Sequence, residues 1–179
     1  MSRSRDIADS TKTLGVDGGT IKLDGNYPVG TQNVALGDTA LDSVAADGNY
    51  NTAIGHASLT ANTTGDTNSA LGRESLLSNT TGSSNTAVGY TALLNNTSAS
   101  NNTAVGYQSL YANTTGAQNT AIGRLALDAN TTANENTAVG NSALGANTTG
   151  ASNAALGSNA MTSNTTGASN VAIGDSALY

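Results

Sequence analysis

The chain has 179 residues, of which only 10% are charged, and its net charge of −6 argues against a nucleic-acid-binding surface. Cysteine is absent, which excludes disulfide bonds, thiol catalysis and thiolate-bound zinc. No apolar stretch approaches the roughly 18 residues of a membrane span, so we expect no membrane insertion. The bulk is Ala, Asn, Thr, Ser and Gly, a mixture also found in disordered low-complexity chains. Composition alone therefore does not establish that the chain folds.

Residues 1–32 differ from the rest of the chain and form a separate N-terminal segment. Four of the six basic side chains lie here: Arg3, Arg5, Lys12 and Lys22. The opening MSRSRDIADS lacks the apolar core of a secretory signal. We expect residues 1–32 to contain a short strand and to serve as an attachment segment.

A five-residue motif, Asn-x-Ala-(Val/Ile/Leu)-Gly, recurs nine times from residue 33 onward. Its Asn stands at Asn33, Asn51, Asn68, Asn85, Asn102, Asn119, Asn136, Asn153 and Asn170. The first interval is 18 residues and every later one is 17, without insertion or deletion. Such strict periodicity is typical of identical stacked coils. The sequence therefore predicts an all-β parallel solenoid over residues 33–179, with about nine coils of 17 residues.

Equal positions of successive units, counted from the motif Asn, form lanes along the stack. The fourth lane is aliphatic, and the ninth lane holds Leu41, Leu59, Leu76, Leu93, Leu110, Leu127, Leu144, Met161 and Leu178. β-branched residues favour strands, whereas Gly and Asn favour turns. We expect two short strands in each coil, with coils about 4.8 Å apart.

Asn-Thr-Thr or Asn-Thr-Ser triplets recur at the twelfth position, beginning at Asn62, Asn79, Asn96, Asn113, Asn130, Asn147 and Asn164. They match the acceptor pattern for N-glycosylation. Their repetition at the coil period favours a structural role in the turns instead. Aligned Asn side chains can form hydrogen-bonded ladders along a stack.

Each coil offers only about two sizeable apolar groups, a thin core against a backbone entropy cost of about 1–2 kcal/mol per residue. This imbalance indicates an oligomer. We expect one apolar lane to fill the coil and the other to pack against neighbouring chains. The fourth lane is favoured for the oligomer axis, with candidates Ile54, Leu71, Val88, Val105, Ile122 and Val139.

The unit NTAVGYQSLYANTTG (Asn102 to Gly116) resembles the head repeats of YadA-like trimeric autotransporter adhesins, in the longer form found in phage tail-fibre proteins. The resemblance covers roughly residues 33–179 and implies a left-handed parallel β-roll whose three chains associate into a rod. The second lane departs from the family motif, since Thr52, Thr86 and Thr103 stand where the adhesins have Val. This departure bears on which residues form the trimer interface, and it does not bear on the solenoid.

The resemblance implies a structural fibre or adhesin of a phage virion, in a tail or head fibre, with residues 1–32 contacting other virion proteins. We expect the rod to continue beyond residue 179 in its parent protein. The alternative is the head of a bacterial trimeric autotransporter at the cell surface, which requires a secretory signal and a C-terminal anchor. A third possibility is an ice-binding solenoid. It is disfavoured because the adjacent Thr-Thr pairs would point to opposite sides of a strand.

No residue pattern indicates an enzyme, and we expect no catalytic residue, cofactor or metal site. His56 is the only histidine, no serine lies in a nucleophile elbow, and the acidic residues form no pair suited to catalysis. The sixth lane varies in a way that suggests recognition, because Tyr and Arg bind surfaces well. Its candidates for contact with a host glycan or protein are His56, Arg73, Tyr90, Tyr107 and Arg124.

Overall fold

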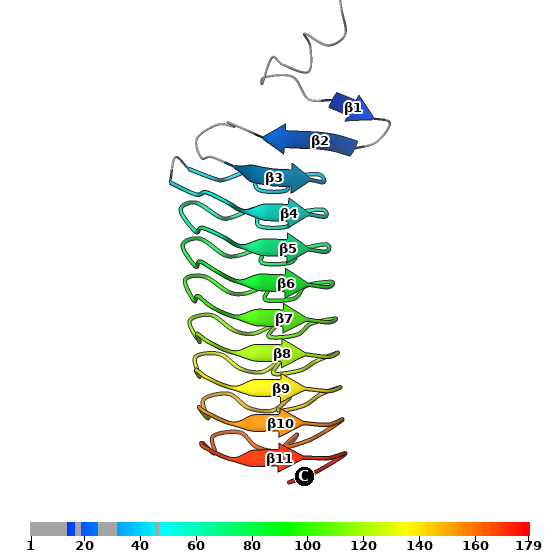
Figure 1. Cartoon of the computed structure of the whole chain (residues 1–179), viewed down its shortest axis with the longest axis vertical. Helices are drawn as coiled ribbons and strands as arrows, with labels where there is room; N and C mark the ends of the chain where they lie inside the picture. The colour runs from blue at the N-terminus through cyan, green and yellow to red at the C-terminus, as the bar shows by residue number, and fades with distance from the viewer. Residues whose placement is uncertain (1–13, 17–18, 25–31, 46) are drawn as a thin grey trace, which may run out of the picture.

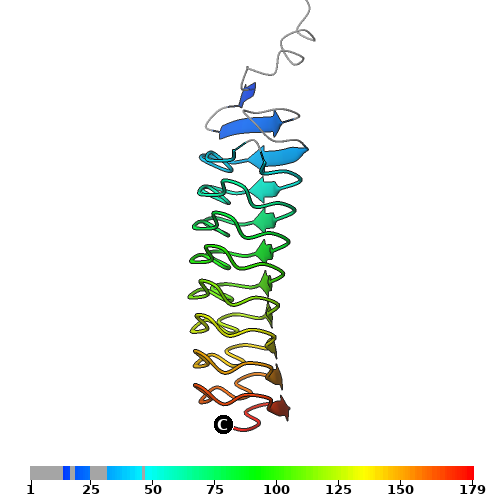
Figure 2. The ribbon, with the colours of Figure 1, turned by 90° about the vertical axis from the view of Figure 1, so that its left-hand side faces the viewer.

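A computed structural model of the chain describes residues 14–16, 19–24, 32–45 and 47–179. These residues contain no helix and form eleven strands in one sheet, ordered β1 to β11 as in the sequence. The strands lie one above another in a straight column (Figures 1 and 2). The predicted parallel β-solenoid is therefore confirmed.

Nine parallel strands carry the nine copies of the motif, one strand per copy. They are β3 (Asn33–Leu36), β4 (Thr52–Ile54), β5 (Ser69–Leu71), β6 (Thr86–Val88), β7 (Thr103–Val105), β8 (Thr120–Ile122), β9 (Thr137–Val139), β10 (Ala154–Leu156) and β11 (Val171–Ile173). Equal lane positions pair throughout, as in Ala87 with Ala104. The one longer interval, between β3 and β4, leaves this register unchanged.

Two further strands precede the column, β1 (Leu14–Val16) and β2 (Gly19–Asp24). They pair antiparallel with each other, and β2 pairs antiparallel with β3. The first coil thus has its strand edge covered, which protects a solenoid against end-to-end association. The rest of the predicted attachment segment lies outside the described residues.

The prediction of two strands per coil is wrong, because each described coil has one. The ninth-lane segment still bonds to the next coil, for example from the Leu59 amide to the Ser75 carbonyl at 3.0 Å. However, the seventh and ninth residues take left-handed backbone angles, such as φ 55° at Ala57 and 51° at Leu59. These angles are incompatible with an extended strand and keep the segment in a chain of turns.

The core is built from small side chains and a single large one per coil. Ala in the third lane, Ala or Ser in the eighth, and the ninth-lane Leu are buried from Leu41 to Met161. One lane of Leu therefore fills the interior, and the Ala lanes allow the walls of the coil to approach it. Strand alternation turns the second and fourth positions outward.

Two ladders of buried Asn join successive coils. In the first lane, the backbone N–H of Asn68 donates to Asn51 Oδ1 at 2.9 Å, and the side-chain Nδ2 of Asn68 donates to the Gly82 carbonyl at 2.8 Å. In the twelfth lane, Asn79 Nδ2 donates to Asn62 Oδ1 and to the same Gly82 carbonyl. The ladders thus converge on one carbonyl in this coil and satisfy polar groups that the narrow core would otherwise leave unpaired. The exception among the described residues is Asn136 Nδ2, which is buried without a hydrogen-bond partner.

The fifth-lane glycines mark the closest approach of one coil to the next. Gly89 has φ 134°, and a Cβ added to it would lie 2.5 Å from the Gly106 carbonyl oxygen. An L-residue would be strained here both by its backbone angle and by the neighbouring backbone. The close contact recurs from Gly37 to Gly157, and the positive φ extends to Gly174, which explains why the motif ends in Gly in every copy.

Replacing Asn102 with Ala tests the contribution of the first-lane ladder. In the wild-type chain the buried backbone N–H of Asn119 donates to Asn102 Oδ1 at 2.9 Å, and the substitution removes this acceptor. We expect a loss of about 1–3 kcal/mol in the free energy of unfolding, measured by chemical denaturation. The matched control is Asn141→Ala, in the exposed sixth lane, which should change stability by less than about 0.5 kcal/mol. Equal losses in both variants would contradict the ladder's role.

Candidate recognition surface

The sixth lane is presented by the end of each strand and the glycine that follows it. The fifth-lane Gly, with φ of 126–141° in all nine copies, ends the strand and turns the chain. The next side chain therefore projects from the edge of the sheet, and His56, Arg73, Tyr90, Tyr107 and Arg124 are all exposed. Because the register never slips between these coils, the five side chains follow one another along the column.

Four of the five predicted residues form a continuous stack, which we call the Arg–Tyr stack: Arg73, Tyr90, Tyr107 and Arg124. The two tyrosine rings are stacked, with centroids 5.6 Å apart and planes 17° from parallel. The Arg73 guanidinium lies 5.6 Å from the Tyr90 centroid, and the Arg124 guanidinium 5.8 Å from that of Tyr107. Both Arg–Tyr distances are within the range of a cation–π interaction.

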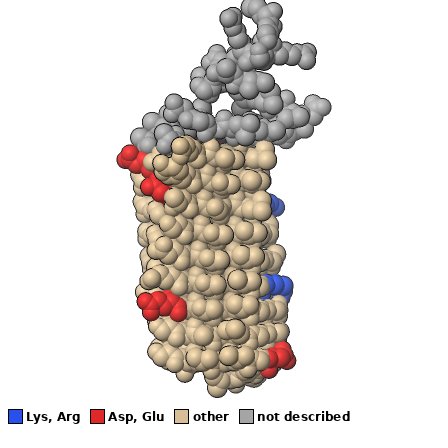
Figure 3. Space-filling view, in the orientation of Figure 1, with Lys and Arg blue, Asp and Glu red and all other residues tan. Residues whose placement is uncertain are grey.

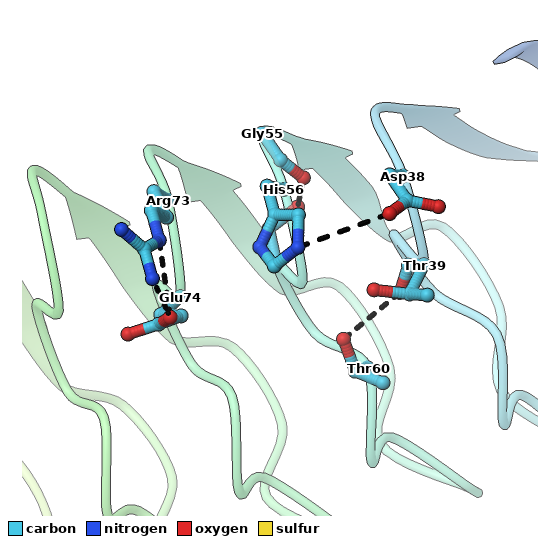
Figure 4. Close-up of polar contacts among 8 residues, drawn as sticks. Asp38, Thr39, Gly55, His56, Thr60, Arg73 and Glu74 are labelled. Carbon is cyan, nitrogen blue, oxygen red and sulfur yellow. Dashed lines mark hydrogen bonds and ion pairs between the residues drawn. The ribbon is translucent and has the colours of Figure 1, made fainter. Parts of the chain in front are cut away.

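His56 belongs to a different group of contacts. Its Nε2 lies 3.8 Å from Asp38 Oδ2, in the preceding coil, and Figure 4 shows the two side chains facing one another. Arg73 bonds to Glu74, its neighbour in the chain, with Nη2 2.8 Å from Oε1 (Figure 4). The predicted stripe is thus divided between an acidic–histidine pair and the Arg–Tyr stack. Sequence reasoning missed Glu74, which lies outside the sixth lane.

Charge is distributed unevenly around the column. Arg73 and Arg124 are the only Lys or Arg residues in 33–179, and Figure 3 shows groups of this kind along one edge of the face drawn. Acidic groups lie mainly along the opposite edge of that face (Figure 3). Among the described residues, Arg124 has no acidic partner at ion-pair distance. Arg124 is therefore the least neutralised cation of the column.

A second surface of interest is the outer face of the parallel sheet. The fourth lane lies on it and is half-buried or exposed along its whole length, with exposures of 49% at Leu71 and 72% at Ile173. Beside it runs the second lane, which holds Thr52, Thr86, Thr103, Thr120 and Thr137. The six candidates for an oligomer axis, Ile54, Leu71, Val88, Val105, Ile122 and Val139, thus share one straight face of the free chain. The second-lane Thr residues could have been placed on this face from the sequence, because side chains on either side of an inward-facing Ala in a strand point outward.

The twelfth-lane Asn residues are held inside the chain. Asn62, Asn79, Asn96, Asn113, Asn130 and Asn147 are fully buried, whereas Asn164, near the end, is partly exposed. In the thirteenth lane, Thr63 Oγ1 donates to the Thr80 carbonyl of the next coil at 2.9 Å, and the pattern repeats along the column. Both lanes therefore join coils to one another.

No group of three or more His, Asp or Glu side chains that could hold a metal ion occurs among the described residues. Nor do these residues contain a helix long and apolar enough to cross a bilayer. Comparisons with protein-family models, curated proteins and solved structures found no match to the chain.

Asp128 provides a test of the electrostatics near Arg124. Partial burial raises the pKa of the Asp128 carboxyl, against smaller opposing effects of a backbone hydrogen bond and of Arg124. The folded state therefore binds this proton more tightly than the unfolded chain does. Consequently, the carboxyl opposes folding once pH rises above the unfolded value of about 3.8.

We expect Asp128→Asn to raise the melting temperature at pH 7 by a few degrees at most, and the gain to vanish below about pH 3, where both forms are neutral. Thermal denaturation across this range measures the effect. Asp175→Asn, at an exposed position, is the control and should show a smaller gain at pH 7. A destabilised Asp128→Asn chain at pH 7 would contradict the assignment.

Proposed function

We propose that this chain is a structural fibre or adhesin segment of a phage virion. In this proposal it forms a left-handed β-roll that associates as a parallel homotrimer, a rigid rod that holds or forms a host-recognition surface. The observation that carries it is the fourth lane, a continuous aliphatic stripe on the outer face of the sheet. A stripe of this kind is typical of a surface that is covered by another protein chain.

The stripe is regular enough to suit a copy of the same chain. It runs through nine successive strands without a charged residue, from Leu36 to Ile173. Because every coil adds the same rise, the fourth-lane residues of a second, parallel copy can pack against those of the first at every coil. Closed cyclic symmetry would then bury the stripe of every protomer equally. Burial would also compensate for the thin core of the single column, which has one large side chain per coil.

The number three and the virion setting come from the resemblance to the longer YadA-like repeats of phage tail fibres. Within this proposal, residues 1–32 contact other virion proteins through their basic groups, Arg3, Arg5, Lys12 and Lys22. A bacterial autotransporter head is the alternative, and a secretory signal and membrane anchor encoded in the parent gene would favour it.

Light scattering coupled to size exclusion tests the oligomer. We expect the wild-type chain to have three times the 17.6 kDa of one protomer. The triple variant Val88→Thr/Val105→Thr/Ile122→Thr keeps β-branched side chains on the strands but places hydroxyls in the stripe. It should shift the mass toward one chain at micromolar concentration while the circular dichroism of the sheet persists.

The control variant is Leu77→Thr/Leu94→Thr, in the tenth lane, where Thr60 and Thr162 occur naturally. It makes the same kind of change away from the strands and should keep the trimer mass. A wild-type chain that is monomeric would contradict the trimeric fibre. Thermal hysteresis would then be measured, because the second-lane Thr residues would stand on an open, regular face as in an ice-binding solenoid.

A further inference from the structure

We propose that the Arg–Tyr stack binds an acidic glycan, and that it does so through the ring edges and donor groups rather than the ring faces. This inference names the ligand class of the recognition surface, and it therefore rests on the proposed role in host recognition.

The faces of both tyrosine rings are already occupied. One face of Tyr90 lies against Tyr107, 5.6 Å between centroids, and Arg73 also stands 5.6 Å from the Tyr90 centroid. Tyr107 has Arg124 at 5.8 Å in addition to Tyr90. A sugar ring cannot stack on these faces without displacing a neighbour. The stack therefore lacks the open aromatic platform on which neutral sugars are usually held.

What remains exposed is electropositive and rich in hydrogen-bond donors. The edge of an aromatic ring carries the positive part of its quadrupole, and the phenol adds an O–H donor. A guanidinium has five N–H donors and no acceptor, in a fork that fits carboxylate, sulfate and phosphate oxygens. Tyr90 and Tyr107 are exposed to 40% and 45%, which leaves these edges in contact with solvent. Such a rim favours oxygen-rich anions.

The two arginines contribute unequally. Arg73 uses Nε and Nη2 on Glu74 Oε1, at 3.1 and 2.8 Å, so its charge is largely neutralised and only its other N–H groups are free. Arg124 has no such partner among the described residues, and it interacts electrostatically with the half-buried Asp128. We therefore place the acidic group of the ligand at Arg124, and its hydroxyl groups along the tyrosines toward Arg73.

The shape of the stack matches an extended chain rather than a compact ion. Four successive coils span about 14 Å, given the spacing of neighbouring strands. The rest of the column carries no other Lys or Arg from 33 to 179 and repels polyanions, since its net charge is negative. A linear acidic polysaccharide lying along the rod thus finds attraction only at this stripe.

Binding of the full chain to three related polymers, measured by biolayer interferometry, tests the inference. Neutral dextran, carboxymethyl-dextran and dextran sulfate share one backbone and differ in their acidic group. We expect measurable binding to at least one acidic polymer and none to dextran. The polymer that binds more tightly identifies the acid as carboxylate or sulfate. Binding to neutral dextran as tight as to both acidic polymers, or no binding at all, would overturn the inference.

Two double variants with equal loss of charge locate the site. Arg73→Gln/Arg124→Gln removes both cations of the stack and should weaken binding roughly tenfold or more, as expected for a lost charge-assisted hydrogen bond. Arg3→Gln/Arg5→Gln removes two cations from the N-terminal segment and should change affinity less than about twofold. Equal losses in the two variants would show a general charge effect and reject the site.

Light scattering on the same samples separates this inference from the proposed function. A monomeric chain that binds acidic dextran at Arg73 and Arg124 would reject the trimeric fibre and keep the glycan site. A trimeric chain without such binding would reject the glycan site and keep the fibre.

Discussion

The structure depends on one constraint, the 17-residue interval, constant from Asn51 onward, that brings equal backbone and side-chain groups of successive coils together. Buried Asn side chains enforce it, because first-lane residues such as Asn68 accept a hydrogen bond from the next coil and donate one within their own. Among the described residues, Asn136 departs from this pattern, since its Nδ2 has no partner. A slip of one residue would replace these amides by Thr or Ser and leave buried donors unpaired. The fifth-lane glycines add a steric limit, since no side chain fits between Gly89 and Gly106.

Strict register also creates the two continuous stripes on the outside of the column, the Arg–Tyr stack and the apolar fourth lane. A lane in which residues can vary becomes a stripe whose members touch across coils, and the Arg–Tyr stack is the clearest case. The outward fourth lane becomes an apolar stripe for the same reason. In the proposals made above, recognition and assembly use different positions of one repeat, two residues apart, and each position can change without altering the ladders inside. The N-terminal hairpin β1–β2 completes the column by pairing with β3.

Much of this architecture could be predicted from the sequence, because spacing alone assigns each residue to a lane. The parallel solenoid and the alignment of Tyr90 with Tyr107 both follow from it. The second strand was predicted wrongly, since β-strand propensity does not reveal the left-handed angle that Leu59 shares with the other ninth-lane residues. The Arg73–Glu74 pair was also missed. Adjacent residues of an extended segment point apart, whereas Glu74, at φ 59°, lies beside Arg73.

Small-angle X-ray scattering of the full chain tests the central claim most directly, because it reports mass, length and cross-section together. The account predicts a rod whose repeat region is about 40 Å long at the strand spacing, with a forward-scattering mass three times 17.6 kDa. Its cross-section should hold three columns side by side. A rod of the same length with the mass of one chain would contradict the assembly, and the profile of an unfolded chain would contradict the solenoid itself.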